Sequence, residues 1–109
     1  MLWSTNTMKI YKVEIDSSAR EDLMFLFNFL KEVKSQTGAN QYIDMIIAEV
    51  QSLSVFAGLY RISHFADVLC YHPNARRMVS HNKKWVYIFH IEDDVVVVDR
   101  IRPAKMITK

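Results

Sequence analysis

The sequence feature that most constrains the fold is a pair of β-rich segments near the C-terminus, residues 84–92 and 95–101, separated by Asp93 and Asp94. In the first segment aromatic residues alternate with aliphatic ones, and the second segment opens with four consecutive valines. β-Branched side chains disfavour a helix and suit a strand. The two acidic residues fit the two-residue loop of a hairpin. We therefore predict an antiparallel hairpin at the centre of a sheet.

Counting back from this loop predicts the pairing of the two strands. The expected pairs are Glu92 with Val95, Ile91 with Val96, Phe89 with Val98 and Tyr87 with Arg100. One face then carries Trp85, Tyr87, Phe89, Ile91, Val96 and Val98, and the other carries Val86, Ile88, His90, Val97, Asp99 and Ile101. Because both faces are apolar near the loop, we expect the hairpin to lie inside the sheet rather than at its edge.

Upstream of the hairpin, alternating apolar residues predict a strand over residues 9–15. A Ser-x-x-Glu capping box at Ser18 and Glu21 predicts a helix from there to about Lys34. We expect Gly38 to end this helix in a left-handed conformation, with a second helix continuing to about Leu53. The connection is short, so the two helices should form an antiparallel pair.

Apolar residues recur at helical intervals over residues 59–70, which favours a third, short helix, and residues 75–80 are expected to form a strand. The order is therefore strand, helix, helix, short helix and three strands. This order predicts an α+β two-layer domain with a mainly antiparallel sheet and a helical hairpin on one face. We assign residues 1–109 to a single domain and expect residues 1–7 to be a loosely held N-terminal extension.

Composition excludes several classes of function. Half of the 109 residues are hydrophobic, and the formal charge of +2 is too small to indicate a nucleic-acid binder by itself. The single Cys70, expected to be a small buried residue, excludes an internal disulfide, and we find no spacing typical of a metal site or cofactor. We see no signal peptide and no apolar run near the roughly 20 residues of a membrane span. These features predict a soluble, cytoplasmic protein.

Three parts of the sequence, in this order, resemble the RelE/ParE toxin superfamily of bacterial type II toxin–antitoxin systems. They are the helix start at residues 16–23, the Arg-containing strand at 75–79, and the aromatic-rich strand that leads through acids into a β-branched strand at 85–101. The resemblance covers residues 8–106. It implies a compact toxin that a cognate antitoxin protein holds inactive.

The superfamily has two branches with different activities. RelE-like members cut messenger RNA on the ribosome without a metal, whereas ParE-like members act on DNA gyrase and lack the nuclease residues. The RelE-like pattern matches this sequence at Arg77 and only loosely at Lys105. The RelE-like branch has an Arg directly after the aromatic residue that begins the next strand, and here Val86 follows Trp85 at that position. By elimination, the resemblance favours a ParE-like, non-catalytic toxin. A divergent endoribonuclease and an inactive antitoxin-binding module remain alternatives.

Basic residues provide the first candidate binding site. Arg76, Arg77, Lys83, Lys84, Arg100, Arg102 and Lys105 are expected near one another on neighbouring strands and the tail. They either form a patch that binds an acidic antitoxin, gyrase or RNA phosphates, or are solvated strand ends that prevent the sheet edge from aggregating. Among the histidines, His64, His72 and His81 are expected on loops or at the surface. His90 is the candidate for an unusual acid–base role, because it should share a face with Asp99.

The first predicted helix provides the second candidate site. Phe25 and Phe29 extend its apolar surface well beyond the stripe that faces a core. Either these rings pack on the neighbouring helix, or they form a surface that docks a partner such as the antitoxin.

Overall fold

The computed structural model describes residues 9–106 and contains a four-stranded sheet in the order β1-β4-β3-β2. The strands are β1 (Lys12–Ile15), β2 (Arg76–Val79), β3 (Trp85–Glu92) and β4 (Val95–Pro103). β3 pairs antiparallel with both β2 and β4, and β1 is parallel to β4. The hairpin of β3 and β4 therefore occupies the middle of the sheet, as predicted. The proposed extension at residues 1–7 lies outside the described residues.

The pairing of β3 with β4 follows the prediction near the loop and departs from it farther away. Glu92 pairs with Val95, and Phe89 pairs with Val98. The register then shifts between Ile88 and Phe89, so that Ile88 pairs with Arg100 and Tyr87 pairs with Ile101 rather than with Arg100. The shift leaves Asp99 as an extra residue in β4, which is the arrangement of a β-bulge. As a result Ile101 belongs to the main core and not to the opposite face.

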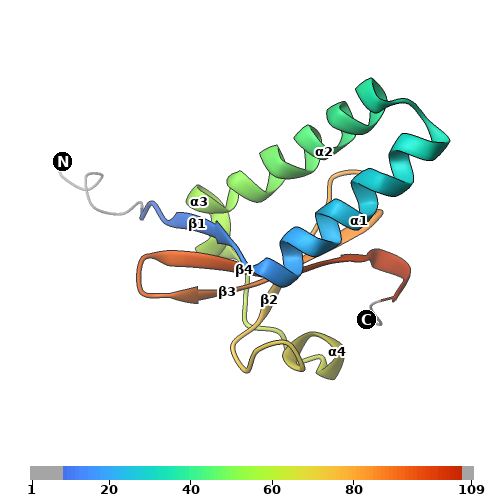
Figure 1. Cartoon of the computed structure of the whole chain (residues 1–109). Coiled ribbons are helices and arrows are strands. Elements are labelled where there is room, and N and C mark those ends of the chain that lie inside the picture. The colour runs from blue at the N-terminus through green and yellow to red at the C-terminus, as the bar shows by residue number, and fades with distance from the viewer. Residues whose placement is uncertain (1–8, 107–109) are drawn as a thin grey trace.

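Two long helices, α1 (Ser17–Val33) and α2 (Gln36–Gln51), lie together on one side of the sheet (Figure 1). The predicted cap of α1 at Ser18 and the predicted role of Gly38 are both wrong. Asp16 caps α1 by accepting a hydrogen bond from the Ser18 backbone N–H at 3.1 Å. Ser35 caps α2 by accepting one from the Gly38 N–H at 3.0 Å, so Gly38 lies in the first turn of α2 and does not end α1.

The chain between α2 and β2 is less helical than predicted. After α3 (Leu53–Phe56) and η1 (Ala57–Leu59), only α4 (Ala66–Leu69) is an α-helix. Residues 60–65 are not helical, because this stretch runs beside β2, where Ile62 bridges to Arg76 and the Ser63 N–H donates to the Ala75 carbonyl at 2.8 Å. Cys70 follows α4 and is exposed, contrary to expectation.

Both faces of the sheet are covered. The helical side buries the main core, which includes Leu26, Ile46, Val50, Tyr87 and Phe89. On the other side, where α4 lies (Figure 1), a smaller cluster buries Val68, Ala75, Val86 and Ile88. The short helix η2 (Ala104–Met106) follows β4, and Ala104 packs on this second cluster.

A network of polar contacts joins α2 to the sheet. Glu49 accepts hydrogen bonds from the Tyr87 hydroxyl and from the backbone N–H of His81. The Tyr42 hydroxyl accepts one from Trp85 Nε1 at 2.9 Å. Burial, together with the hydrogen bond to Glu49, raises the pKa of Tyr87 well above its usual value. Tyr87 therefore stays protonated and fixes α2 against β3.

The continuous helical run Gln36–Leu59 is long and apolar enough to cross a membrane by length and composition, with a mean hydropathy of 1.3. The expectation that the chain contains no such run is therefore wrong. Length and composition alone are weak evidence, because the core helix of a folded domain passes the same test. Here Ile46, Val50 and Leu53 are fully buried in the main core, and 22% of the apolar window of this run is buried inside the domain.

Candidate functional site

An open groove of about 980 Å³ lies between α1 and the end of the sheet where β3 begins and β4 finishes. Its apolar lining consists of Phe25, Leu26, Phe29, Leu30, Val33, Trp85, Ile101 and Pro103. Its polar lining consists of Glu21, Asp22, Lys34, Tyr42, Lys84 and Arg102. We call it the α1 groove.

The two aromatic residues singled out on α1 are strongly exposed in this groove. Phe25 is 79% exposed and Phe29 is 57% exposed, although Leu26 and Leu30, one position later in each case, are buried. Residues four apart lie on the same side of a helix, so the two rings form one apolar surface. The packing of α1 on the sheet and on α2 leaves this surface uncovered. An uncovered aromatic pair beside a groove is typical of a site that binds another protein.

Asp22, in the floor of the same groove, locks α1 to β4. Its carboxylate accepts hydrogen bonds from Arg100 Nε at 2.9 Å and Nη2 at 3.0 Å, and from the Ile101 backbone N–H at 2.9 Å. β1 pairs with β4 only as far as Val98, so this carboxylate takes the place of a strand neighbour for Ile101. The hydrogen bond to Asp22 raises the pKa of Arg100 above its usual value. The charge of Arg100 is therefore paired inside the fold. Asp22 also interacts with a second arginine, because Arg102 Nη1 lies 4.0 Å from Asp22 Oδ1.

The remaining basic candidates do not all share one face of the sheet, because Arg76 and Arg77 are consecutive residues of β2. Arg76 Nη1 donates to the Tyr60 carbonyl at 2.6 Å, and its Nε is a buried nitrogen with no hydrogen-bond partner among the described residues. Arg77, the next residue in β2, points to the other face of the sheet, where its guanidinium lies 5.4 Å from the centre of the Phe65 ring. Lys83 is exposed in the turn before β3, with φ of 66°. Lys105 is exposed in η2.

His90 lies in a polar cluster on the second face of the sheet. It is 5% exposed, its Nδ1 lies 2.8 Å from Asp99 Oδ2, and its Nε2 lies 3.0 Å from Glu92 Oε2. The expectation that His90 and Asp99 share a face is confirmed. The ring of His72 stacks on that of His90, with centroids 3.6 Å apart and planes 4° from parallel. Burial raises the pKa of Asp99 above its usual value, while its hydrogen bond from His90 acts in the opposite direction.

Sequence reasoning missed His72, because its position depends on the path of the loop from α4 to β2. It also missed Glu92 and Asp22, which look like ordinary acids of a turn and a helix start. His64 and His81 are exposed, as expected.

Val86, which stands where RelE-like nucleases have an Arg, is 1% exposed in the second cluster. Val68, Ala75 and Ile88 surround it, and the half-buried Phe65 and Tyr71 close over the cluster. This part of the second face is thus filled by apolar side chains.

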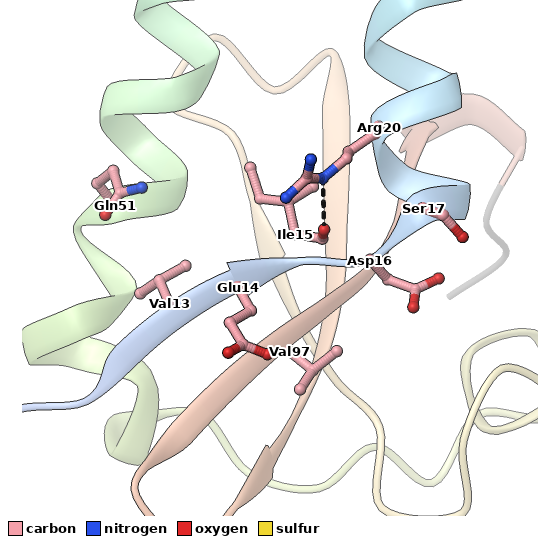
Figure 2. A pocket seen from close by; sticks show the side chains of 8 residues that line it. All are labelled: Val13, Glu14, Ile15, Asp16, Ser17, Arg20, Gln51 and Val97. Atoms are coloured by element: carbon pink, nitrogen blue, oxygen red, sulfur yellow. Dashed lines mark hydrogen bonds between the residues drawn. The ribbon is translucent and has the colours of Figure 1, made fainter.

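A second hollow, of about 640 Å³, lies at the free edge of β1 and is shown in Figure 2. The Arg20 side chain crosses this hollow between α1 and α2, and its Nε donates to the Ile15 carbonyl at 2.9 Å. Glu14 and Val97 are paired residues on the other face of the strands. Arg20 therefore ties the first turn of α1 to the end of β1, which is a structural role.

The sequence matches no protein-family model and no curated protein. Solved structures do resemble the fold. One chain, from a structure described as "Chromosomal ParDE TA system from P. aeruginosa", superposes with a TM-score of 0.71, and the match covers 86% of this chain and 96% of that chain. The chain has a ParE-like RelE/ParE fold. The predicted fold class and the resemblance of the sequence to this superfamily are thereby confirmed at the level of the fold. The two sequences are only 14% identical, so this similarity shows the fold alone.

Proposed function

We propose that this protein is the toxin component of a type II toxin–antitoxin system and that a cognate antitoxin neutralises it by binding in the α1 groove. The observation that carries the proposal is the exposed pair Phe25 and Phe29 beside an apolar groove, on a ParE-like RelE/ParE fold. The similar structure is described as a ParDE TA system, which supports a partner protein of this kind. Lys34, Lys84 and Arg102 border the groove, so a partner segment that combines apolar and acidic residues fits it best.

We further propose that the toxin acts in the cytoplasm by binding an essential protein, with DNA gyrase as the first target to test, and is not an enzyme. The filled surface around Val86 supports this choice over ribosome-dependent cleavage of messenger RNA, because an RNA-cutting site needs exposed cations around the phosphate. Arg77 lies over Phe65, and Arg100 is paired with Asp22.

Inducible expression in bacterial cells tests the proposed activity. We expect growth to stop, with DNA breaks appearing and transcripts remaining intact, and purified protein to inhibit gyrase supercoiling. Widespread transcript cleavage without DNA damage would show a nuclease instead. Harmless expression of folded protein would show an inactive antitoxin-binding module. A small neighbouring gene with a DNA-binding half and an amphipathic half would identify the antitoxin, and its coexpression should restore growth.

The double variant Phe25→Ser/Phe29→Ser tests the binding surface. Because both rings are already exposed, we expect the free energy of unfolding to change by no more than about 0.5 kcal/mol per substitution. Aromatic residues at the centre of an interface contribute about 2 kcal/mol or more each, so antitoxin affinity should fall at least about 30-fold. Phe56→Ser is the matched control, since Phe56 is 48% exposed on α3 and outside the groove. Equal affinity of the double variant and the control would place the antitoxin elsewhere.

A further inference from the structure

We propose that His72, His90 and Glu92 form a binding site for a transition-metal ion of the zinc class, with Asp99 positioning His90. The site lies on the second face of the sheet, away from the α1 groove, and the inference does not depend on the proposed function. Two histidines and a carboxylate are ligands that zinc accepts readily. Imidazole nitrogen also suits cobalt, nickel and copper, whereas magnesium and calcium prefer oxygen ligands alone.

The distances are close to those of a metal site. The candidate ligand atoms of the three residues all lie within 4.8 Å of one another, and His90 Nε2 is 3.0 Å from Glu92 Oε2. Zinc bonds of about 2.1 Å in tetrahedral geometry place neighbouring ligand atoms about 3.4 Å apart. An imidazole binds a metal in its own ring plane, so the His72 ring must turn out of its parallel stack on His90 to bring the three atoms to bonding distance. Three protein ligands leave a fourth position for water, as in an open zinc site.

The polar contacts of His90 suit a metal ion between its Nε2 and Glu92. His90 Nδ1 lies 2.8 Å from Asp99 Oδ2, and because an ionised carboxylate only accepts, this contact favours the neutral tautomer with its proton on Nδ1. The lone pair of Nε2 then faces the Glu92 oxygen, which is also an acceptor, at 3.0 Å. Two acceptors at this distance need a proton or a metal ion between them. A carboxylate on the far nitrogen of a ligating histidine is the usual support for such a ligand, and it fixes both the tautomer and the ring orientation.

His72 supplies the third ligand from a different part of the chain. It lies in the loop between α4 and β2, and its ring stacks on that of His90 at 3.6 Å. Its Nδ1 now accepts a hydrogen bond from the Asn74 backbone N–H at 3.0 Å. Asn74 is exposed, so water replaces this bond at small cost when His72 turns towards the metal. The bound ion would link the loop that covers the second face to the sheet beneath it.

The site is accessible from solvent while its key ligand is held rigidly. The Glu92 side chain is 63% exposed and His72 is half-buried, whereas the His90 side chain is 6% exposed. An ion can therefore enter past Glu92 and His72 and reach His90 Nε2. The same exposure allows His72 and Glu92 to be replaced without emptying the core.

Titration of the full-length, tag-free protein with Co²⁺ and with Zn²⁺ tests this proposal. We expect one Co²⁺ per chain with the visible absorption of a four-coordinate ion, its displacement by Zn²⁺, and a higher melting temperature with Zn²⁺ than with EDTA. His72→Ala and Glu92→Ala should each lower the affinity at least 10-fold and remove the Zn²⁺-dependent rise in melting temperature. His81→Ala, which replaces an exposed histidine outside the cluster, should bind like the wild type.

Asp99→Asn tests the positioning role separately. It should lower metal affinity about 10- to 100-fold while keeping the stoichiometry of one ion per chain, as expected for a group that orients a ligand. Absence of a four-coordinate Co²⁺ spectrum in the wild type would overturn the proposal, and so would unchanged affinity in both His72→Ala and Glu92→Ala. In either case the cluster would be a polar group held by a proton alone. If His72→Ala fails to fold in EDTA, the exposed Glu92→Ala variant decides the matter.

Discussion

Replacing Asp22 by Ala should be among the most damaging changes that a polar side chain of this fold allows. The Asp22 carboxylate accepts three hydrogen bonds, two from the Arg100 guanidinium and one from the Ile101 backbone N–H, and its side chain is 13% exposed. Removing it leaves Arg100 without its partner and the Ile101 N–H without an acceptor. Hydrogen bonds to charged groups contribute about 1.5 to 3 kcal/mol, and an unsatisfied buried donor costs about 1 to 3 kcal/mol.

These contributions overlap, and the Arg100 side chain, at 29% exposure, recovers part of its hydration. We therefore expect Asp22→Ala to lower the free energy of unfolding by about 3 kcal/mol, measured by urea denaturation. Asp22→Asn keeps an acceptor for Ile101 and should cost about half as much. Asp44→Ala is the matched control, because Asp44 is an exposed acid on α2.

A double-mutant cycle isolates the interaction with Arg100. If Arg100 acts inside the fold, Arg100→Ala should add little to Asp22→Ala, with a coupling energy of about 1 to 3 kcal/mol. A loss of less than about 0.5 kcal/mol for Asp22→Ala, or additive effects of the two substitutions, would refute this account. In that case Arg100 would again be a candidate for contact with a partner.

Two further substitutions test the packing of the sheet. Val86→Arg places a charge in the second cluster, where Val86 is 1% exposed. It should lower the free energy of unfolding, measured in urea, by at least about 3 kcal/mol. A well-folded variant with near wild-type stability would show that this face has room for the Arg of a nuclease. Tyr87→Phe removes the hydroxyl that donates to Glu49 and should lower the free energy of unfolding by about 1 to 2 kcal/mol. Tyr60→Phe, at a half-buried ring, is the control and should be nearly neutral. Equal losses of stability in the two variants would show that the Glu49 contact does not stabilise the fold.

The hairpin shows how far local sequence specifies the fold. Alternation and a two-residue acidic loop suffice to predict β3, β4 and their pairs next to the loop, because these depend on neighbours in the chain. The bulge at Asp99 depends instead on what surrounds β4, including the Asp22 carboxylate that binds the Ile101 N–H. One extra residue reverses the faces of everything beyond it. That is why Ile101 lies in the core, contrary to the prediction.

The candidate sites show the same division between local and distant contacts. His90 and Asp99 meet because they are neighbours across one hairpin, and the sequence pattern predicts this. His72 reaches them through a loop whose path is set by non-local contacts, including the bond of Ser63 to Ala75, and no periodicity reports such a path. The misplaced caps are smaller errors of the same kind. Asp16 and Ser18 both favour a helix start, and the backbone geometry of the preceding strand decides between them.

Internal pairing also explains why counting basic residues overestimates the binding surface. Arg100 is held by Asp22, and Arg76 donates to a backbone carbonyl, so neither charge is free to face a partner. Lys84 and Lys34, by contrast, line the α1 groove, and Arg102 lines it too while lying 4.0 Å from Asp22. Charge and exposed aromatic surface therefore converge at this groove, although Lys84 and Arg102 lie more than fifty residues beyond Phe29 in the sequence. A partner that binds there must present apolar side chains to Phe25 and Phe29 and acids to these cations, which is a stricter requirement than either feature alone.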